Sequence, residues 1–262
     1  NIRFGVREHA MGAISNGLAY TQEWIPYTAT FLVFADYMRP TLRLAALSHL
    51  QTLFIFTHDS FWVGEDGPTH QPIEQIESLR LIPNLNVYRP ADGLEVALCY
   101  ASALKRQNGP SALLFTRQGL PTLNRSRGTT PQDLEHGAYA VIECGKPEII
   151  LVATGSEVAT ACEAAAILES KNKAVKVVSM PCVENYCCQD SAWKEALIPS
   201  GVPTAVVEAG TTGLWSSYLG RVVLELGKTS FGASAPGELL AKEFGFTAES
   251  IAERALASLE AS

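Results

Sequence analysis

Short, continuous apolar runs alternate with helix-like segments along most of this chain, and this alternation constrains the fold more than any other feature. In the first half the strand-like runs are Ile2–Val6, Tyr27–Leu32, Leu53–Phe56, Leu85–Tyr88 and Ala112–Thr116. The helix-like segments are His9–Tyr20, Phe34–Leu50 (which Pro40 is expected to kink or split), Ile73–Leu81 and Asp92–Arg106. Apolar strands separated by helices form parallel sheets that are covered on both faces. The sequence therefore predicts an α/β fold.

A polar stretch interrupts the alternation near the middle of the chain. We interpret residues 123–134 as a linker, with one domain at residues 1–122 and a second at residues 135–262. The alternation then restarts, and Thr154 and Glu157 have capping-box spacing before a helix expected at Glu157–Ser170. The other elements expected here are strands at Ala138–Cys144, Ile149–Ala153, Val175–Met180 and Ala205–Glu208, followed by three helical patterns. The predicted architecture is two doubly wound domains with mainly parallel sheets.

Composition and charge exclude several classes of protein. The 262 residues are 18% charged and 47% hydrophobic, as in ordinary globular domains. The net charge of −7 argues against nucleic-acid binding, and no apolar run approaches the roughly 20 residues of a membrane span. The six cysteines form no repeated C-x-x-C pattern, so we expect free thiols and a cytoplasmic protein. The chain begins at Asn1 rather than Met, and we interpret it as a processed or truncated piece.

Charged and polar residues follow three of the predicted strands at the point where each strand ends. Glu8 follows the first run, His58 follows the run ending at Phe56, and Arg117 follows the run ending at Thr116. In an open parallel sheet, ligands bind beyond the carboxyl ends of the strands. We therefore expect Glu8, His58 and Arg117 to share one crevice.

Each of these candidates also has a purely structural interpretation. Glu8 is either a first-turn acid that the helix dipole stabilises or a carboxylate that exchanges a proton with a bound heterocycle. Phe31, Phe34 and Tyr37 stand three apart and form either part of a core or a face on which a planar ligand stacks. The Arg117 guanidinium suits either a phosphate or a surface salt bridge.

The loop after His58 has metal binding as its main alternative. His58 and His70 are twelve positions apart with Gly and Pro between them, which matches no tight zinc-ligand pattern. Residues 64–67 look like a metal-diphosphate motif but lack its downstream Asn. Imidazole and carboxylate groups hydrogen-bond to hydroxyls in fixed directions. We therefore favour recognition of a polyhydroxy substrate by His58, Asp66 and His70.

Together these motifs resemble the C-terminal part of a transketolase, a thiamine-diphosphate enzyme of sugar-phosphate metabolism. Deoxyxylulose-phosphate synthases and the β subunits of 2-oxoacid dehydrogenases share the Glu but differ in the later loop. A part of such a synthase is one alternative, and a non-catalytic assembly or regulatory module of the same fold is another. The segments that carry the resemblance extend over essentially the whole chain and are Gly5–Met11, Thr30–Phe34, Thr57–Ser60, Gly64–Pro72, Thr116–Gln118, Val152–Val158 and Phe231–Pro236.

The resemblance implies a binding site for thiamine diphosphate. Glu8 would hydrogen-bond N1′ of the aminopyrimidine and favour the imino tautomer, whose nitrogen removes the thiazolium C2 proton. Phe34 would stack on the pyrimidine, with Phe31 and Tyr37 completing the pocket. A two-carbon ketol unit would then move from a ketose phosphate to an aldose phosphate.

The resemblance also implies how the sugar phosphates bind. Asp66 would contact the aldose C2 hydroxyl, and His70 would lie near the reacting carbons as a second catalytic residue beside Glu8. His58 and Arg117 would hold the substrate phosphate. Trp62 stands where the family usually has Gly, and we expect it to narrow the substrate channel. The segment Val183–Cys188 departs from the family with no expected catalytic effect.

A whole transketolase needs more than these residues. Its N-terminal domain binds the diphosphate through Mg²⁺, and its cofactor lies at a dimer interface between the pyrimidine domain of one subunit and the diphosphate domain of the other. The resemblance therefore implies that the Mg²⁺ ligands lie on an N-terminal part outside this chain. We expect a homodimer or a split, heteromeric enzyme, and no activity from this chain alone.

Overall fold

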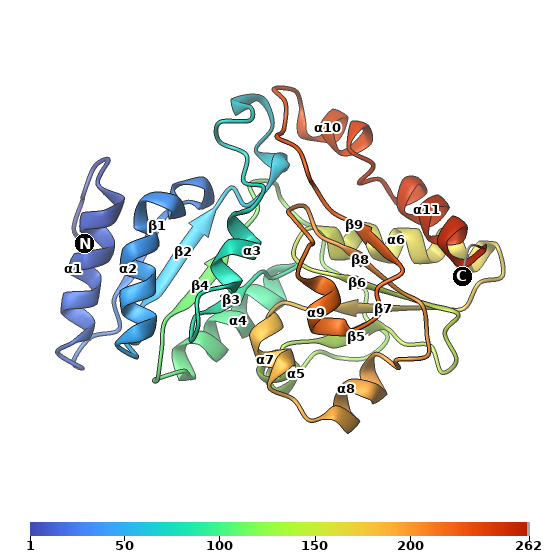
Figure 1. Ribbon diagram of the computed structural model, residues 1–262, viewed down its shortest axis with the longest axis horizontal. Coiled ribbons are helices and arrows are strands. Elements are labelled where there is room, and N and C mark those ends of the chain that lie inside the picture. Colours follow the sequence, from blue (N-terminus) through green and yellow to red (C-terminus); the bar gives the residue numbers. More distant parts are fainter. Residues whose placement is uncertain (261–262) are drawn as a thin grey trace.

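The computed structural model describes residues 1–260 and contains two β-sheets, each with helices on both faces (Figure 1). The first sheet has the strand order β1-β2-β4-β3, and every neighbouring pair is parallel. Its elements are α1 (Glu8–Ala19), β1 (Tyr27–Phe31), η1 (Leu32–Phe34), α2 (Ala35–Leu47), β2 (Leu53–Thr57), η2 (Phe61–Asp66), α3 (Gln75–Arg80), β3 (Asn86–Tyr88), α4 (Gly93–Lys105) and β4 (Ser111–Leu114).

The second sheet has the order β5-β7-β6-β8-β9 and is parallel except for β5, which pairs antiparallel with β7. Its elements are α5 (Pro131–His136), β5 (Tyr139–Ile142), β6 (Ile149–Ala153), α6 (Glu157–Ser170), β7 (Val175–Ser179), α7 (Val183–Cys187), α8 (Ser191–Leu197), β8 (Thr204–Val207), α9 (Trp215–Leu219), β9 (Leu224–Leu226), α10 (Gly237–Glu243) and α11 (Ala248–Glu260). The predicted fold, two α/β domains with mainly parallel sheets, is confirmed.

Alternation along the buried strands assigns their side chains to the two faces of each sheet. In β4, Ala112 and Leu114 pack with α2 and α3, whereas Leu113 faces the side covered by α4. The same α4 side continues into one face of the second sheet, where α6 and α11 pack. The two domains therefore share one continuous apolar core, which fixes their relative position.

In the first domain and the linker, the structure differs from the expected local structure at three places. Residues 2–6 form no strand: Gly5 has a φ of +65°, the Arg7 N–H donates to Gly5 O (3.0 Å), and Val6 is 92% exposed. This segment pairs with no strand of the described sheets, and the left-handed φ of Gly5 interrupts its extended course. Pro40 does not split α2, because it lies on an exposed face where water can satisfy the carbonyl it leaves free. The segment interpreted as a linker contains the start of α5, which a Thr130–Asp133 capping box specifies.

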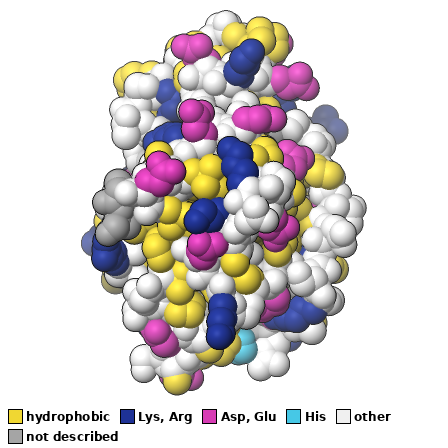
Figure 2. All heavy atoms as spheres, turned by 90° about the vertical axis from the view of Figure 1, so that its right-hand side faces the viewer, with side chains coloured by type: hydrophobic (Ala, Val, Ile, Leu, Met, Phe, Trp, Pro, Cys, Tyr) yellow, Lys and Arg dark blue, Asp and Glu magenta, His cyan; other side chains and the backbone are white. Residues whose placement is uncertain are grey.

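Three properties of the structure relate to the classes of protein that the composition favoured or excluded. All six cysteines are unpaired thiols. Within residues 1–260, no helix has the length and apolar character that crossing a bilayer requires. On the face that forms the right-hand side of Figure 1, Lys and Arg side chains are interspersed with Asp and Glu rather than gathered in one patch (Figure 2).

Candidate functional site

A row of stacked rings lies where β1 and β2 end. These strands are parallel with Phe31 opposite Thr57, so His58 comes directly beside Phe31. The Phe31 and His58 rings stack with centroids 3.6 Å apart and planes 16° apart. The chain turns through η1 into α2 and adds Phe34 (6.1 Å from Phe31) and then Tyr37 (6.1 Å from Phe34) to the row. Phe31 and Phe34 are half-buried and Tyr37 is 65% exposed, so the row lies at the surface rather than in the core.

The loop 58–72 brings a second histidine back to the same row. His58 has a left-handed φ of +59°. Gly64 and Gly67 have φ values of +80° and +79°, a conformation that residues with a β-carbon rarely adopt. These turns return the chain so that His70 meets Phe34 edge-on, with ring centroids 5.8 Å apart. The two histidines, far apart in sequence, therefore contact one aromatic surface.

Charges of both signs surround His58. Partial burial is the largest cause that lowers the pKa of His58 below its ordinary value of 6.5, and Arg117 lowers it further. Asp66 and Asp59 act in the opposite direction on the same pKa. Arg117 and Asp66 are both exposed. His58 is therefore neutral at neutral pH, between a guanidinium and carboxylates.

Glu8 occupies the first turn of α1 and is half-buried. Because residues 2–6 are not a strand, α1 rather than the sheet positions it; α1 packs on α2 and β1 and begins at the edge where β1 and β2 end (Figure 1). Among residues 1–260 its carboxylate has no hydrogen-bond or ion-pair partner. The structure thus brings the ring row, His70, Asp66 and Arg117 together around His58, whereas Glu8 forms no hydrogen bond or ion pair with any of them.

The aromatic row and the Glu8 carboxylate fit an aminopyrimidine. A flat heterocycle needs an exposed ring face and a hydrogen-bonding group, and the residues present supply both. No group of three His, Cys, Asp or Glu side chains within residues 1–260 is arranged to hold a metal ion. Imidazole, carboxylate and guanidinium groups around one surface suit a phosphorylated polyhydroxy compound.

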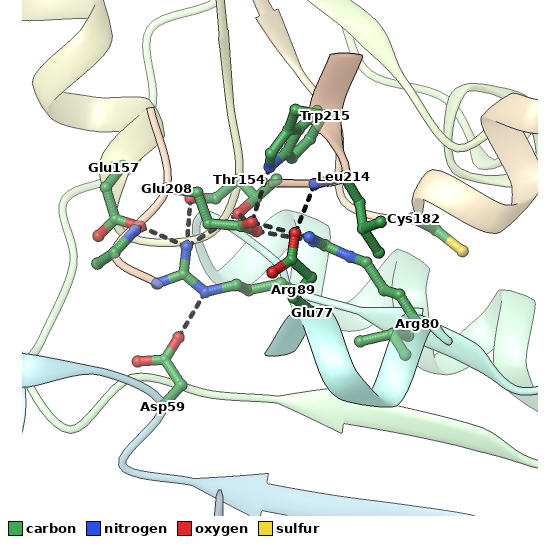
Figure 3. Close-up of polar contacts among 12 residues, drawn as sticks. Asp59, Glu77, Arg80, Arg89, Thr154, Glu157, Cys182, Glu208, Leu214 and Trp215 are labelled. Atoms are coloured by element: carbon green, nitrogen blue, oxygen red, sulfur yellow. Dashed lines mark hydrogen bonds and ion pairs between the residues drawn. The ribbon is translucent and has the colours of Figure 1, made fainter. Parts of the chain in front are cut away.

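A buried polar network beneath the loop was missed at the sequence level. Arg89, at the end of β3, is fully buried and donates from Nε to Asp59 (2.7 Å) and from Nη1 to Glu157 of the second domain (Figure 3). Asp59 directly follows His58 and is 1% exposed. Beside it, Arg80 donates two hydrogen bonds to Glu208 (2.8 and 2.7 Å), again between the domains. In the sequence, the only indication of this network was that the acidic residue Asp59 follows the predicted site residue His58.

Trp62, which we expected to narrow the substrate channel, contacts both the loop and the second domain. Its ring stacks on Phe61 with centroids 5.1 Å apart, and it lies against Gly237 at the start of α10. A β-carbon at Gly237 would be 3.0 Å from Trp62 Cε3. Trp62 therefore packs the loop onto the second domain.

Titration of His58 tests this electrostatic arrangement. We expect its NMR titration midpoint to lie below 6.5, to rise in Arg117→Gln and to fall in Asp66→Asn, because each change removes one of the opposing charges. Since the folded pKa is below the unfolded value, the stability from neutral His58 is present above pH 6.5 and is lost as the pH falls through the folded pKa. If neither substitution shifted the midpoint, His58, Arg117 and Asp66 would not share a site.

Comparison with known proteins identifies the family. The family model described as "Transketolase, pyrimidine binding domain" matches residues 1–122, and that described as "Transketolase-like TK C-terminal domain" matches residues 137–247. The transketolase of Aquifex aeolicus is 47% identical over 258 residues, covering 98% of this chain and 37% of that protein.

Solved structures agree with this match. The transketolase from Leishmania mexicana superposes with a TM-score of 0.94 at 42% identity, covering 99% of this chain and 38% of that one. A structure described as "Split gene transketolase, inactive beta4 tetramer" has a TM-score of 0.82 at 23% identity, covering 98% of this chain and 83% of its own. This chain thus spans a little over a third of the length of its full-length relatives, and it belongs to the transketolase family, matching the C-terminal part.

Proposed function

We propose that this chain is the C-terminal part of a transketolase that moves a two-carbon ketol unit from a ketose phosphate to an aldose phosphate with thiamine diphosphate. The observation that carries the proposal is the convergence of the ring row, His58 and His70 beyond the carboxyl ends of β1 and β2. The proposed domains are residues 1–122 and 135–262 with a linker at 123–134, which the matched ranges support.

On the cofactor side, this chain would hold the aminopyrimidine. Phe34 would stack on the ring, with Phe31 and Tyr37 closing the pocket at either side, and the Glu8 carboxylate would hold a proton at N1′. The absence of a competing partner for Glu8 among residues 1–260 supports this assignment. When bound, thiamine diphosphate would supply an acidic thiazolium carbon, which becomes nucleophilic toward a ketose carbonyl once its proton is removed.

On the sugar side, four side chains would bind and orient the substrates. Arg117 and His58 would hold the phosphate, the guanidinium through its charge and the neutral imidazole through a hydrogen bond. Asp66 would accept a hydrogen bond from the aldose C2 hydroxyl. His70, held edge-on against Phe34, would donate or accept a proton at the reacting oxygens.

The remaining half of the site would come from outside this chain. We propose that Mg²⁺ and the diphosphate bind to an N-terminal part, and that the assembled enzyme is a homodimer or a heteromer of split chains. The span of this chain, 37% of the Aquifex aeolicus protein, supports a missing N-terminal part. The split-gene structure supports the proposal only in that a chain of similar extent exists there as a separate polypeptide. Alone, this chain is expected to be inactive.

Reconstitution tests this proposal. The chain would be mixed with the N-terminal part of the Aquifex aeolicus transketolase, Mg²⁺ and thiamine diphosphate, and complex formation would be confirmed by size-exclusion chromatography before xylulose 5-phosphate consumption is assayed. We expect activity from the complex and none from either part alone. A complex that forms but stays inactive beside an active full-length control would argue for a non-catalytic module. Activity from this chain alone would contradict the shared site.

A further inference from the structure

A segment of the second domain, residues 231–237, lies along the loop 58–72 of the first domain. It rises from β9 to α10 beside the loop in Figure 1, and η2 packs closely on α10. Ser234 Oγ donates a hydrogen bond to Glu65 O (2.5 Å). Gln71 Nε2 donates both to Gly64 O within the loop (2.8 Å) and to Ala233 O across the domain boundary (2.9 Å). These bonds hold the loop at the residues flanking Asp66.

The two segments leave no room for a β-carbon on Gly232 and only a tight fit for one on Gly67. A β-carbon on Gly232 would lie 1.6 Å from Gln71 Oε1 and 2.8 Å from Gln71 Cδ. Gln71 is 2% exposed, so its amide could move only by giving up its two hydrogen bonds. A β-carbon on Gly67 would lie 3.3 Å from Ser234 Cβ. Residues 231–237 and the loop 58–72 are therefore closely packed at both positions.

The other end of the loop is also held from the second domain. Arg89 connects Asp59, the neighbour of His58, to Glu157 at the start of α6 (Figure 3). Between these two anchors the loop has few internal hydrogen bonds. Examples are the turns in which Gly67 N donates to Gly64 O (3.0 Å) and His70 N donates to Gly67 O (3.1 Å). Residues 65, 66, 68 and 69 are exposed.

We infer that residues 231–237 of the second domain position the sugar-binding loop, with Gly232 and Ser234 as positioning residues for Asp66 and His70. This inference rests on the proposed function only for what the loop binds. Groups that orient a substrate lose effect when they move by about 1 Å, so a loop held by so few internal bonds needs support from outside. The second domain, which contributes no proposed catalytic residue, thereby acts on substrate binding.

Hydrogen exchange in the full chain tests the contact itself. The variants are Gly232→Ala, which displaces Gln71, and Ser234→Ala, which removes the bond to Glu65. Their matched controls are Gly201→Ala, where a β-carbon meets nothing within 4 Å, and Ser217→Ala, an exposed serine bonded only within the second domain. We expect about tenfold faster exchange in peptides covering residues 61–72 in Gly232→Ala, a smaller increase in Ser234→Ala, and no change in either control. Unchanged loop exchange in Gly232→Ala, or faster exchange throughout the chain, would overturn the inference.

Kinetics of the reconstituted enzyme then separate positioning from a merely structural role. We expect Gly232→Ala to raise KM for the aldose phosphate, the proposed partner of Asp66, about tenfold while the apparent affinity for thiamine diphosphate stays unchanged. Equal losses for substrate and cofactor would contradict positioning. If the wild-type complex has no ketol-transfer activity, the proposed function fails, and the exchange experiment alone decides whether the second domain holds the loop.

Discussion

Replacing Arg89 with methionine should destabilise the protein by about 3–5 kcal/mol, the largest effect on stability that we expect from a single change. Arg89 is fully buried and pairs with Asp59 and Glu157, which are 1% and 2% exposed. Burial alone would lower the pKa of Arg89, but Asp59 and Glu157 outweigh it and raise that pKa above its ordinary value. Without the guanidinium, two carboxylates on different domains would be buried with no cation between them.

Urea unfolding would measure this effect against two controls. Arg89→Lys keeps the charge but loses the planar fork that reaches Asp59, Thr154 and Glu157 together, so it should fall between wild type and Arg89→Met. Lys105→Met breaks the exposed ion pair with Glu135 and should change stability by less than about 1 kcal/mol. An Arg89→Met protein that unfolds at the wild-type urea concentration would show that the network does not hold the domains together.

Replacing Glu8 with glutamine should have the largest effect on activity. In the reconstituted enzyme we expect kcat to fall by about 10²–10⁴-fold, because the amide is nearly the same size but cannot exchange the proton at N1′. Glu8 is half-buried in the first turn of α1 with no partner among residues 1–260, so the change should lower the free energy of unfolding by less than about 1 kcal/mol.

The matched control for Glu8 is Glu253→Gln on α11, an exposed acid far along the chain from the candidate site. It should leave both kcat and stability at wild-type values. If Glu8→Gln retained wild-type kcat while binding thiamine diphosphate normally, Glu8 would be a first-turn helix acid and no more.

The elements that the sequence predicted well are those whose pattern depends only on neighbours in the chain. Strands such as Ile149–Ala153 and the helix Glu157–Ser170 have the expected bounds, because burial on both faces leaves a continuous apolar run. Residues 2–6 show the limit of this reasoning. They are apolar enough for a strand, but a strand also needs a partner, and the sequence does not say whether one is present.

The candidate site was predictable in part. Parallel pairing of β1 and β2 follows from the fold, and it places His58 beside Phe31. The spacing of the aromatic residues could not decide between core and ligand face; exposure of Tyr37 in the folded chain supports the ligand face.

Polar contacts between residues far apart in the chain could not be predicted from the sequence. Thr154 and Glu157 have capping-box spacing, but α6 begins after Ser156 and their side chains serve the domain interface instead. Thr154 Oγ1 donates to Glu208, and Glu157 accepts from Arg89, which is 68 positions away in the chain. Local spacing identifies residues able to cap a helix, whereas only the folded chain shows which competing partner a buried carboxylate has.

The most direct test of the central claim is to follow the two carbons that a transketolase moves. A chimera of the Aquifex aeolicus N-terminal part and this chain would receive Mg²⁺, thiamine diphosphate, an aldose phosphate and a ketose phosphate labelled with ¹³C at C1 and C2. We predict that NMR will show both labels moving together to C1 and C2 of the lengthened sugar. A folded, cofactor-bound chimera that leaves the label in the donor, or that instead consumes pyruvate with release of CO₂, would contradict the assignment.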